Sequence, residues 1–217
     1  MDFDSLTTLT AEQRELLLAV ATSRTFRRRE TLFHAGDPGD SIFLIRSGHV
    51  AIRIVTEHGD NATLAVLGPG DTFGELALLS PGRRRSATAT ALEETVTWTL
   101  SRSQLSGARA DHLPIEALLI QLLSNQVHRL TGQLVDALYV PVRHRVARVL
   151  IDLCEQYDEG APRVTMLVTQ DDIAGLTGAG RPTVNQVLRT LEADGAIELR
   201  RGRIDVIDRA ELARHRG

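Results

Sequence analysis

Hydrophobic and polar positions change their spacing twice along this chain of 217 residues. Residues 5–20 have the spacing of a short amphipathic helix, which either Ser5 or Thr10 would cap. Its apolar face would carry Leu16, Leu17 and Val20. From Thr25 to about Leu100 the apolar residues alternate along short runs, which is typical of β-strands.

The β-rich runs are centred on residues 42–45, 50–54, 64–66 and 96–100. Glycine-containing turns separate them at residues 36–40, 47–48, 58–61 and 68–71. Several short strands at near-regular spacing are typical of an antiparallel barrel or a double-sheet roll. The pattern therefore predicts an N-terminal antiparallel β-roll of the jelly-roll type.

A helical period begins at Pro114 and continues to about Leu138. Its apolar residues step by three and four positions in turn, as in a heptad seam. They are Ile120, Leu123, Val127, Leu130, Leu134 and Ala137. The alternative is a helix packed on its own barrel, but a two-chain coiled coil fits better because the stripe runs for about 25 residues beside polar positions. Pro141 ends this helix and marks the next domain boundary.

Residues 169–189 carry the constraints of a helix-turn-helix motif at fixed offsets. Counting from Gln170, the small residue Ala174 falls at the fifth position, where the two helices cross closely. Gly178 falls at the ninth, in a turn that requires the left-handed conformation. Ile173, Val184 and Val187 would complete a small core. A chance helical hairpin is the weaker explanation, because four constraints match together.

The second helix of this motif would begin near Gly180 and enter the major groove. Arg181 at its N-terminal end suits bidentate contact with guanine O6 and N7. Gln186 is a candidate for reading adenine or touching a phosphate, and Asn185 is expected on the same exposed face. Gln170, Thr183 and Arg189 suit phosphate contacts that set the register. For any one of these residues the alternative is an ordinary solvated helix face.

Residues 197–206 are typical of a tight hairpin with a basic turn, the wing of a winged helix-turn-helix domain. Arg200, Arg201 and Arg203 would meet the phosphate backbone there. The predicted DNA-binding set is Thr169, Gln170, Gly180, Arg181, Pro182, Thr183, Gln186, Arg189 and Arg201.

Composition and charge change this picture little. The net charge is −3, and all 25 basic residues are arginine. Residues 142–217 carry as many acids as arginines, so DNA affinity must come from the placement of arginines on one face. The single cysteine, Cys154, lies in an apolar helical stretch and cannot supply the thiolates of an iron–sulfur sensor.

Other function classes find no support in the sequence. The histidines are scattered without a pair four residues apart, and no P-loop or Ser/His/Asp arrangement stands out, so we predict neither a metal site nor an enzyme. Residues 36–40 fit a turn better than a calcium loop. No apolar run reaches the length of a membrane span and residues 1–10 lack a basic leader, so we expect a soluble cytoplasmic protein.

Residues 73–89 read FGELALLSPGRRRSATA and combine groups that suit a nucleotide monophosphate. Gly74 permits a close turn, and Glu75 opens a short helix whose free N–H groups suit an anion. Arg85 can pair with a phosphate in fork geometry, and Ser86 adds a hydroxyl donor. Glu75 can accept a hydrogen bond from a ribose 2′-hydroxyl. Taken alone, Glu75 could instead complement its own helix dipole, and residues 83–85 could be a solvated arginine triplet.

The motifs FGELALL, RRRSATA and GAGRPTVNQVLRTLEADGAI give the chain a specific resemblance to the cyclic-AMP receptor protein/FNR (Crp/Fnr) family of bacterial regulators, over residues 15–210. The resemblance implies an α+β chain with a β-roll sensor at residues 1–112, a dimerisation helix at 113–140 and a winged helix-turn-helix domain at 141–217. It implies a homodimer on a near-palindromic operator, with RNA polymerase as a further partner.

The resemblance also implies cyclic AMP, or a related cyclic nucleotide, as an allosteric ligand. The implied ligand-binding residues are Gly74, Glu75, Leu76, Ala77, Arg85, Ser86, Ala87, Leu130 and Thr131. Family members that bind cyclic AMP keep the glutamate, arginine and serine found here as Glu75, Arg85 and Ser86.

Two positions depart from the family pattern. Leu130 and Thr131 stand where the family has the Thr-Ser or Thr-Asn pair that contacts adenine, and leucine cannot hydrogen-bond the adenine amino group. Pro182 stands where well-studied members carry a glutamate that reads cytosine, so we expect an operator that differs from the usual TGTGA half-site. A family member that works without a cyclic nucleotide is the open alternative, and a module that does not bind DNA is a remote one.

Overall fold

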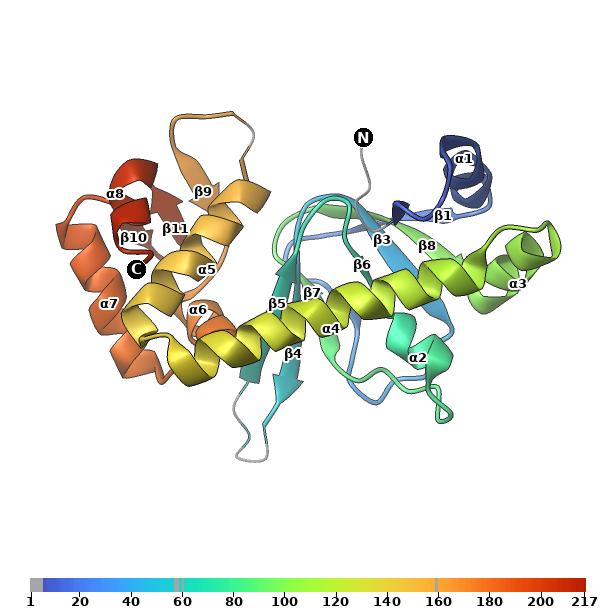
Figure 1. Cartoon of the computed structure of the whole chain (residues 1–217), viewed down its shortest axis with the longest axis horizontal. Coiled ribbons are helices and arrows are strands. Elements are labelled where there is room, and N and C mark those ends of the chain that lie inside the picture. The colour runs from blue at the N-terminus through green and yellow to red at the C-terminus, as the bar shows by residue number, and fades with distance from the viewer. Residues whose placement is uncertain (1–5, 57–58, 60, 159) are drawn as a thin grey trace. The chain divides into compact units, whose positions relative to one another are not determined.

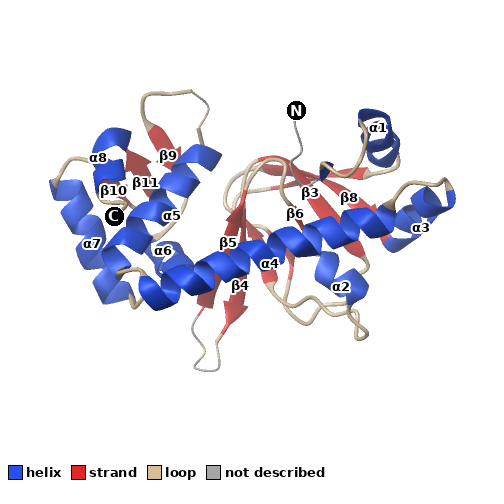
Figure 2. Cartoon of the chain, viewed as in Figure 1, coloured by secondary structure: helices blue, strands red, loops and turns tan. Residues whose placement is uncertain are grey.

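The computed structural model describes residues 6–56, 59, 61–158 and 160–217 (Figure 1). The chain packs as two compact units. The first unit comprises the residues up to Ile52 together with Leu67–Arg129, and the second comprises Arg53–Val66 with Leu130–Gly217. Antiparallel sheets followed by helices and a small C-terminal sheet confirm the predicted α+β class (Figure 2).

Two four-stranded sheets form the N-terminal roll, in the orders β1-β8-β3-β6 and β2-β7-β4-β5. The strands are β1 Thr22–Phe26, β2 Thr31–Phe33, β3 Ser41–Ser47, β4 Val50–Val55, β5 Asn61–Leu67, β6 Thr72–Phe73, β7 Thr88–Ala91 and β8 Thr95–Ser101. The pairs β1–β8, β3–β8, β3–β6 and β2–β7 are antiparallel, as predicted. The runs that alternation identified are β3, β4, β5 and β8. It missed β1 because only Phe26 of that strand is buried.

Strand β3 buries side chains on both faces, which explains its unbroken apolar run. On one face, Ile42 and Leu44 join a cluster that includes residues of the helices at Ala11–Ala19, Arg102–Ala110 and Ile115–Tyr139. On the other face, the Phe43 ring stacks on Phe73 with centroids 5.1 Å apart. The first unit therefore has one core under the helices and an aromatic layer inside the roll.

The first three helices are α1 Ala11–Ala19, α2 Glu75–Leu79 and α3 Arg102–Ala110. Thr10 caps α1 through a capping box with Gln13, which confirms one of the two predicted caps; the helix is therefore shorter than the predicted range 5–20, and Ser5 lies outside the described residues. Leu17 is buried as expected, but Leu16 and Val20 are exposed because the helix turns only a narrow stripe toward the sheet. Helix α3 was not predicted, although the Ser-x-x-Gln capping box that opens it is visible in the sequence.

The long helix α4, Ile115–Tyr139, was predicted almost to the residue. Leu118 and Leu122, at its N-terminal end, are buried in the core of the first unit. Four residues of the predicted seam are exposed: Ile120 is 67% accessible, Val127 61%, Leu130 50% and Leu134 59%. Among the described residues these four side chains stay at least half accessible, which favours the coiled-coil interpretation over a helix packed on its own barrel. Pro141 follows the helix end and is the N-cap of α5.

The second unit contains α5 Val142–Gln156, β9 Val164–Met166, α6 Gln170–Thr177, α7 Arg181–Ala193, β10 Ile197–Arg200, β11 Arg203–Val206 and α8 Arg209–Arg214. Strand order is β10-β11-β9, and β10 and β11 form the predicted wing hairpin. Gly178 has φ of 59°, the left-handed turn expected between α6 and α7. Ile173 and Val184 are fully buried, but Leu188 takes the core place assigned to Val187, which is half-buried. Asn185 is also half-buried instead of exposed.

A buried ion pair joins strand β4 to α6 within the second unit. The Arg53 guanidinium donates to Oδ1 of Asp172, with Nη2 at 2.7 Å, and the Thr63 hydroxyl donates to the same oxygen at 2.7 Å. The other oxygen, Oδ2, accepts from the backbone N–H and hydroxyl of Thr169 in a capping box. A Cβ at Gly175 would lie 2.4 Å from the Thr63 nitrogen, so α6 approaches β5 as closely as glycine permits.

Candidate ligand pocket and nucleic-acid interface

A sharp turn between β6 and α2 begins the first candidate site. Gly74 is the N-cap of α2 and has φ of 88°, a left-handed conformation that favours glycine. A Cβ atom at this position would lie 2.7 Å from Nη1 of Arg85. The close turn expected at Gly74 is therefore present, and it lets the Arg85 guanidinium approach the backbone at the start of the helix.

The Arg85 guanidinium is buried and held by three hydrogen bonds. Nη1 donates to the carbonyl oxygens of Ser41 at 2.8 Å and Gly74 at 3.0 Å, and Nη2 donates to the Ser41 hydroxyl at 3.0 Å. The guanidinium also lies over the Phe33 ring, 4.3 Å from its centroid. Within the described residues, the buried Nε has no hydrogen-bond partner. Arg85 is thus fixed in place while one donor stays unsatisfied.

Glu75 is the first residue of α2, and its side chain is buried. Burial raises the pKa of its carboxyl above the ordinary value, and the backbone hydrogen bond and the charges of Arg129 and Arg85 offset this only in part. The Arg85 pKa is lowered by burial, against the opposing effect of Asp40 and Glu75. Arg85 and Glu75 are therefore both largely shielded from water, so each can form a strong polar interaction with a ligand.

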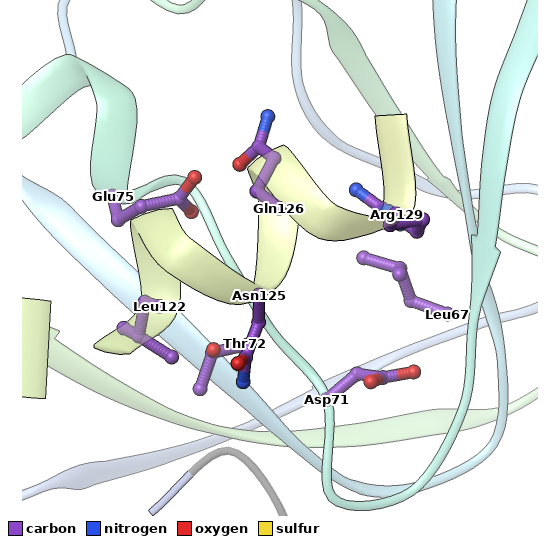
Figure 3. A pocket seen from close by; sticks show the side chains of 8 residues that line it. All are labelled: Leu67, Asp71, Thr72, Glu75, Leu122, Asn125, Gln126 and Arg129. Atoms are coloured by element: carbon purple, nitrogen blue, oxygen red, sulfur yellow. The ribbon is translucent and has the colours of Figure 1, made fainter. Parts of the chain in front are cut away.

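A cavity of about 130 Å³ opens beside Glu75 (Figure 3). It is lined by Leu67, Asp71, Thr72, Glu75, Leu122, Asn125, Gln126 and Arg129. Polar side chains come from two parts of the chain: Asp71, Thr72 and Glu75 from the turn, β6 and α2, and Asn125, Gln126 and Arg129 from α4 (Figure 3). The cavity offers both donors and acceptors to a ligand.

The structure gathers part of the predicted ligand set. Gly74, Glu75 and Arg85 converge, whereas the Ser86 side chain is exposed beside them. Ala77 and Ala87 are buried and Leu76 is half-buried. Leu130 and Thr131 are exposed and belong to the second unit, so their predicted contact with the ligand stays a prediction.

Sequence reasoning missed the pocket residues of α4. Asn125, Gln126 and Arg129 were read only as positions beside a coiled-coil seam, or not at all. A visible signal existed, because residues one turn apart on a helix share a face and this face is polar. Ser41, which holds Arg85, gave no sequence signal because the two residues lie 44 positions apart.

Gly39 controls how closely the turn at residues 36–40 approaches residues 73–89, the segment that we call the cassette. A Cβ there would lie 2.5 Å from the Ala77 Cβ and 2.8 Å from Nε of Arg85. We expect Gly39→Ala to lower the free energy of unfolding by about 1–3 kcal/mol through overpacking, measured by thermal or urea unfolding. Gly82→Ala is the matched control, because its Cβ would meet only Arg84 Cγ, at 3.9 Å. Equal stability of the two variants would contradict the packing described here.

The second candidate site lies on α6, α7 and the wing. Arg181 opens α7 as expected, with Gly180 as N-cap and proline in the first turn. The side chains of Thr183, Gln186 and Arg189 are exposed on this helix, and Gln170 is half-buried at the start of α6. The Thr169 hydroxyl is already used in the capping box of α6. A groove of about 430 Å³ runs between the start of these helices and the wing turn, lined in part by Gln170, Arg181 and Arg201.

The three wing arginines have different surroundings. Asp205 is fully buried, and its Oδ2 lies 3.4 Å from Nε of Arg200, 3.6 Å from Nε of Arg203 and 2.5 Å from Nη2 of Arg163. Burial raises the Asp205 pKa, but hydrogen bonds from Arg163 and Thr165 bring it below the ordinary value. Arg200 and Arg203 are thus partly neutralised, whereas Arg201 is exposed in the turn.

Membrane spans and metal clusters are both absent from residues 6–56, 59, 61–158 and 160–217. None of the helices there combines the length and the hydrophobicity of a membrane span. In the same part of the chain, no three side chains of histidine, cysteine or acid lie grouped as metal ligands.

Comparison with known families matches both sites. The cyclic nucleotide-binding domain model matches residues 23–112, and the Crp-like helix-turn-helix domain model matches residues 144–215. The chain is similar to the CRP-like cAMP-activated global transcriptional regulator of Mycobacterium tuberculosis, with 36% identity over 192 residues, 87% of this chain and 85% of that protein. It is also similar to the cyclic AMP receptor protein of Thermus thermophilus, with 32% identity over 205 residues, 94% and 92% of the two chains.

Solved structures agree with these relatives. A CRP-family transcriptional regulator from Thermus thermophilus has a TM-score of 0.72 and 26% identity, over 89% of this chain and 96% of the other. FixK2 from Bradyrhizobium japonicum has a TM-score of 0.74 over 91% and 98% of the two chains, and its 20% identity supports the fold alone. The likeness therefore covers both the roll with its glycine-turn cassette and the winged helices, and the chain belongs to the Crp/Fnr family of transcription regulators.

Proposed function

We propose that this chain is a cytoplasmic regulator whose affinity for operator DNA depends on a cyclic nucleotide, cyclic AMP, bound in the β-roll. The observation that carries the proposal is the convergence of Gly74, Glu75 and Arg85, together with the polar cavity that Glu75 lines. Relatives named as cAMP-activated or cyclic AMP receptor proteins, at 36% and 32% identity, support the choice of ligand.

Each part of the cassette has a separate task in this proposal. The Arg85 guanidinium pairs with the ligand phosphate, and a phosphate oxygen satisfies the Nε donor that lacks a partner among the described residues. The free N–H groups at the start of α2 add to the positive potential there. The Glu75 carboxylate accepts a hydrogen bond from the ribose 2′-hydroxyl. Burial raises the pKa of Glu75, and this hydrogen bond would stabilise the charged carboxylate against that effect.

The exposed stripe on α4 supports a homodimer. An apolar seam of large side chains that stays half or more exposed in one chain is covered when two such helices pack as a coiled coil. In this dimer, ligand binding shifts the population toward an arrangement with the two recognition helices about one DNA turn, roughly 34 Å, apart. The near-palindromic operator follows from the two-fold symmetry of the dimer. RNA polymerase is the further partner that the family implies.

Calorimetric titration of the full-length protein with cyclic AMP, and separately with cyclic GMP, tests the ligand. Saturable binding of cyclic AMP at one site per chain, together with tighter binding to a DNA duplex selected from a random pool, is the expected result. Binding of neither nucleotide, with DNA binding intact, would contradict the ligand and favour a family member that works without a cyclic nucleotide. A preference for cyclic GMP would show that the natural ligand carries guanine instead of adenine. Such a change would fit the presence of Leu130, which cannot hydrogen-bond the adenine amino group.

Arg201 is expected to contribute a phosphate contact that does not depend on sequence. Arg201→Ala should weaken binding to all duplexes alike and reduce the slope of log affinity against log salt by about one. Fluorescence anisotropy titrations over a series of salt concentrations measure both quantities. Arg214→Ala on α8 removes the same charge away from the groove and should leave the slope unchanged. A loss confined to one operator sequence would show that Arg201 reads a base instead.

A further inference from the structure

Asp171 forms an ion pair with the residue predicted to read the operator. Its Oδ1 lies 3.0 Å from Nε of Arg181, across the turn between α6 and α7. Both side chains are well exposed, 57% for the carboxylate and 63% for the guanidinium. An exposed pair of this kind contributes little to the stability of the free protein in water. We therefore consider its effect in the DNA complex, where water is excluded from the contact.

The pair lies in the groove between the helices and the wing. Among the described residues that line this groove, Asp171 is the acid, and it shares the lining with Arg181, Arg200, Arg201 and Arg203. Arg200 and Arg203 already share the charge of Asp205. A polyanion that enters the groove is therefore repelled by the Asp171 carboxylate, and the charge of Arg181 is already partly neutralised by the same carboxylate.

The contact leaves the reading end of Arg181 open. Asp171 approaches Nε, on the side of the guanidinium, while the two terminal nitrogens are the atoms that donate to guanine O6 and N7 in a bidentate contact. A carboxylate on Nε also limits the rotation of a long side chain, so less freedom is lost when the base contact forms. Displacement of water by DNA strengthens the ion pair, because the local dielectric constant falls.

We infer that Asp171 is a specificity-determining residue of the DNA-binding site: it positions Arg181 for one guanine and weakens binding to duplexes that lack that guanine. The inference rests on the proposed DNA-binding function of this surface. A purely structural role, stabilising the first turn of α6 as any acid there would, predicts a change in stability and none in selectivity.

The test begins with selection of bound duplexes from a random pool by the full-length protein in saturating cyclic AMP, and again without it. Selection with Arg181→Ala identifies the base pair that Arg181 reads, as the one whose preference is lost. Kd values are then measured for the selected duplex, for the duplex substituted at that pair and for a scrambled duplex. The proteins compared are the natural chain, Asp171→Asn, Asp171→Glu and the charge-matched control Glu155→Gln, an exposed acid on α5.

For Asp171→Asn we expect about fivefold tighter binding to the scrambled duplex and a loss of about tenfold in preference for the guanine. Asp171→Glu should keep the weak binding to the scrambled duplex but lose part of the preference, because its carboxylate is displaced by one methylene. Glu155→Gln should change neither ratio.

Three results would overturn the inference. Unchanged selectivity in Asp171→Asn is the first, and equal effects of Asp171→Asn and Glu155→Gln are the second. The third is an Arg181→Ala selection that loses no base preference. If Asp171→Asn does not fold, Asp171→Glu decides the question by its preference ratio. Failure of the natural chain to enrich any duplex would instead refute the proposed function, and the inference with it.

Discussion

Arg85→Ala is expected to lower the affinity for cyclic AMP by about 100-fold or more. A phosphate loses its charge-assisted partner, and hydrogen bonds to a charged group are worth about 1.5–3 kcal/mol each. Calorimetric titration measures the loss directly. Because Arg85 also holds Ser41 and Gly74 and stacks on Phe33, the variant should unfold at a lower temperature as well.

Two further variants separate ligand binding from folding. Arg85→Lys keeps a positive charge but lacks the fork geometry, so we expect reduced affinity with less loss of stability. Arg83→Ala removes an equal charge from an exposed neighbour and should bind cyclic AMP as the natural chain does. Normal titration by Arg85→Ala would show that the phosphate binds elsewhere.

Asp172→Ala is expected to lower the free energy of unfolding of the second unit by about 3–5 kcal/mol. The substitution leaves the Arg53 guanidinium without its carboxylate and removes the capping box that opens α6. Urea unfolding followed by circular dichroism measures the change. Asp171→Asn, one residue away on the same helical turn, serves as a control because its carboxylate is exposed.

A double-mutant cycle isolates the pair itself. Arg53→Met with Asp172→Asn removes both charges, and the double variant should be more stable than the sum of the single effects predicts. Additive effects would show that Arg53 and Asp172 do not interact in solution.

The same carboxylate predicts a pH dependence of stability. Burial raises the Asp172 pKa, but the charge of Arg53 and hydrogen bonds from Arg53, Thr169 and Thr63 outweigh it, so the folded pKa lies below the ordinary value of 3.8. The unfolded chain then binds this proton more readily than the folded chain. The contribution is fully present above the ordinary pKa and is lost as the pH falls through the folded pKa. Asp172→Asn should abolish this part of the acid unfolding profile, recorded by circular dichroism from pH 6 to pH 2.

Local sequence patterns determined the elements that depend on neighbouring residues alone. The heptad-like stripe placed α4 almost to the residue, and the left-handed Gly178 fixed the turn between α6 and α7. The predicted wing hairpin and the turn at Gly74 are also present. Backbone sterics and helical periodicity act over a few residues, so their signals survive in the linear sequence.

Tertiary structure alone decided which charged groups are free. Arg200, Arg201 and Arg203 are alike in sequence, but the buried Asp205 engages Arg200 across the hairpin and Arg203 two residues away on its own strand. The sequence indicated that the Arg85 guanidinium is free to bind a phosphate. In the structure it already donates hydrogen bonds to Ser41, 44 positions away. Asp172 received no role from the sequence, and only the packing of α6 against β4 and β5 brings Arg53, 119 positions away, against it. Hydrophobic spacing specifies which elements form, but the partner of a long polar side chain depends on which elements the fold brings within a few ångströms, and no local pattern encodes that distance.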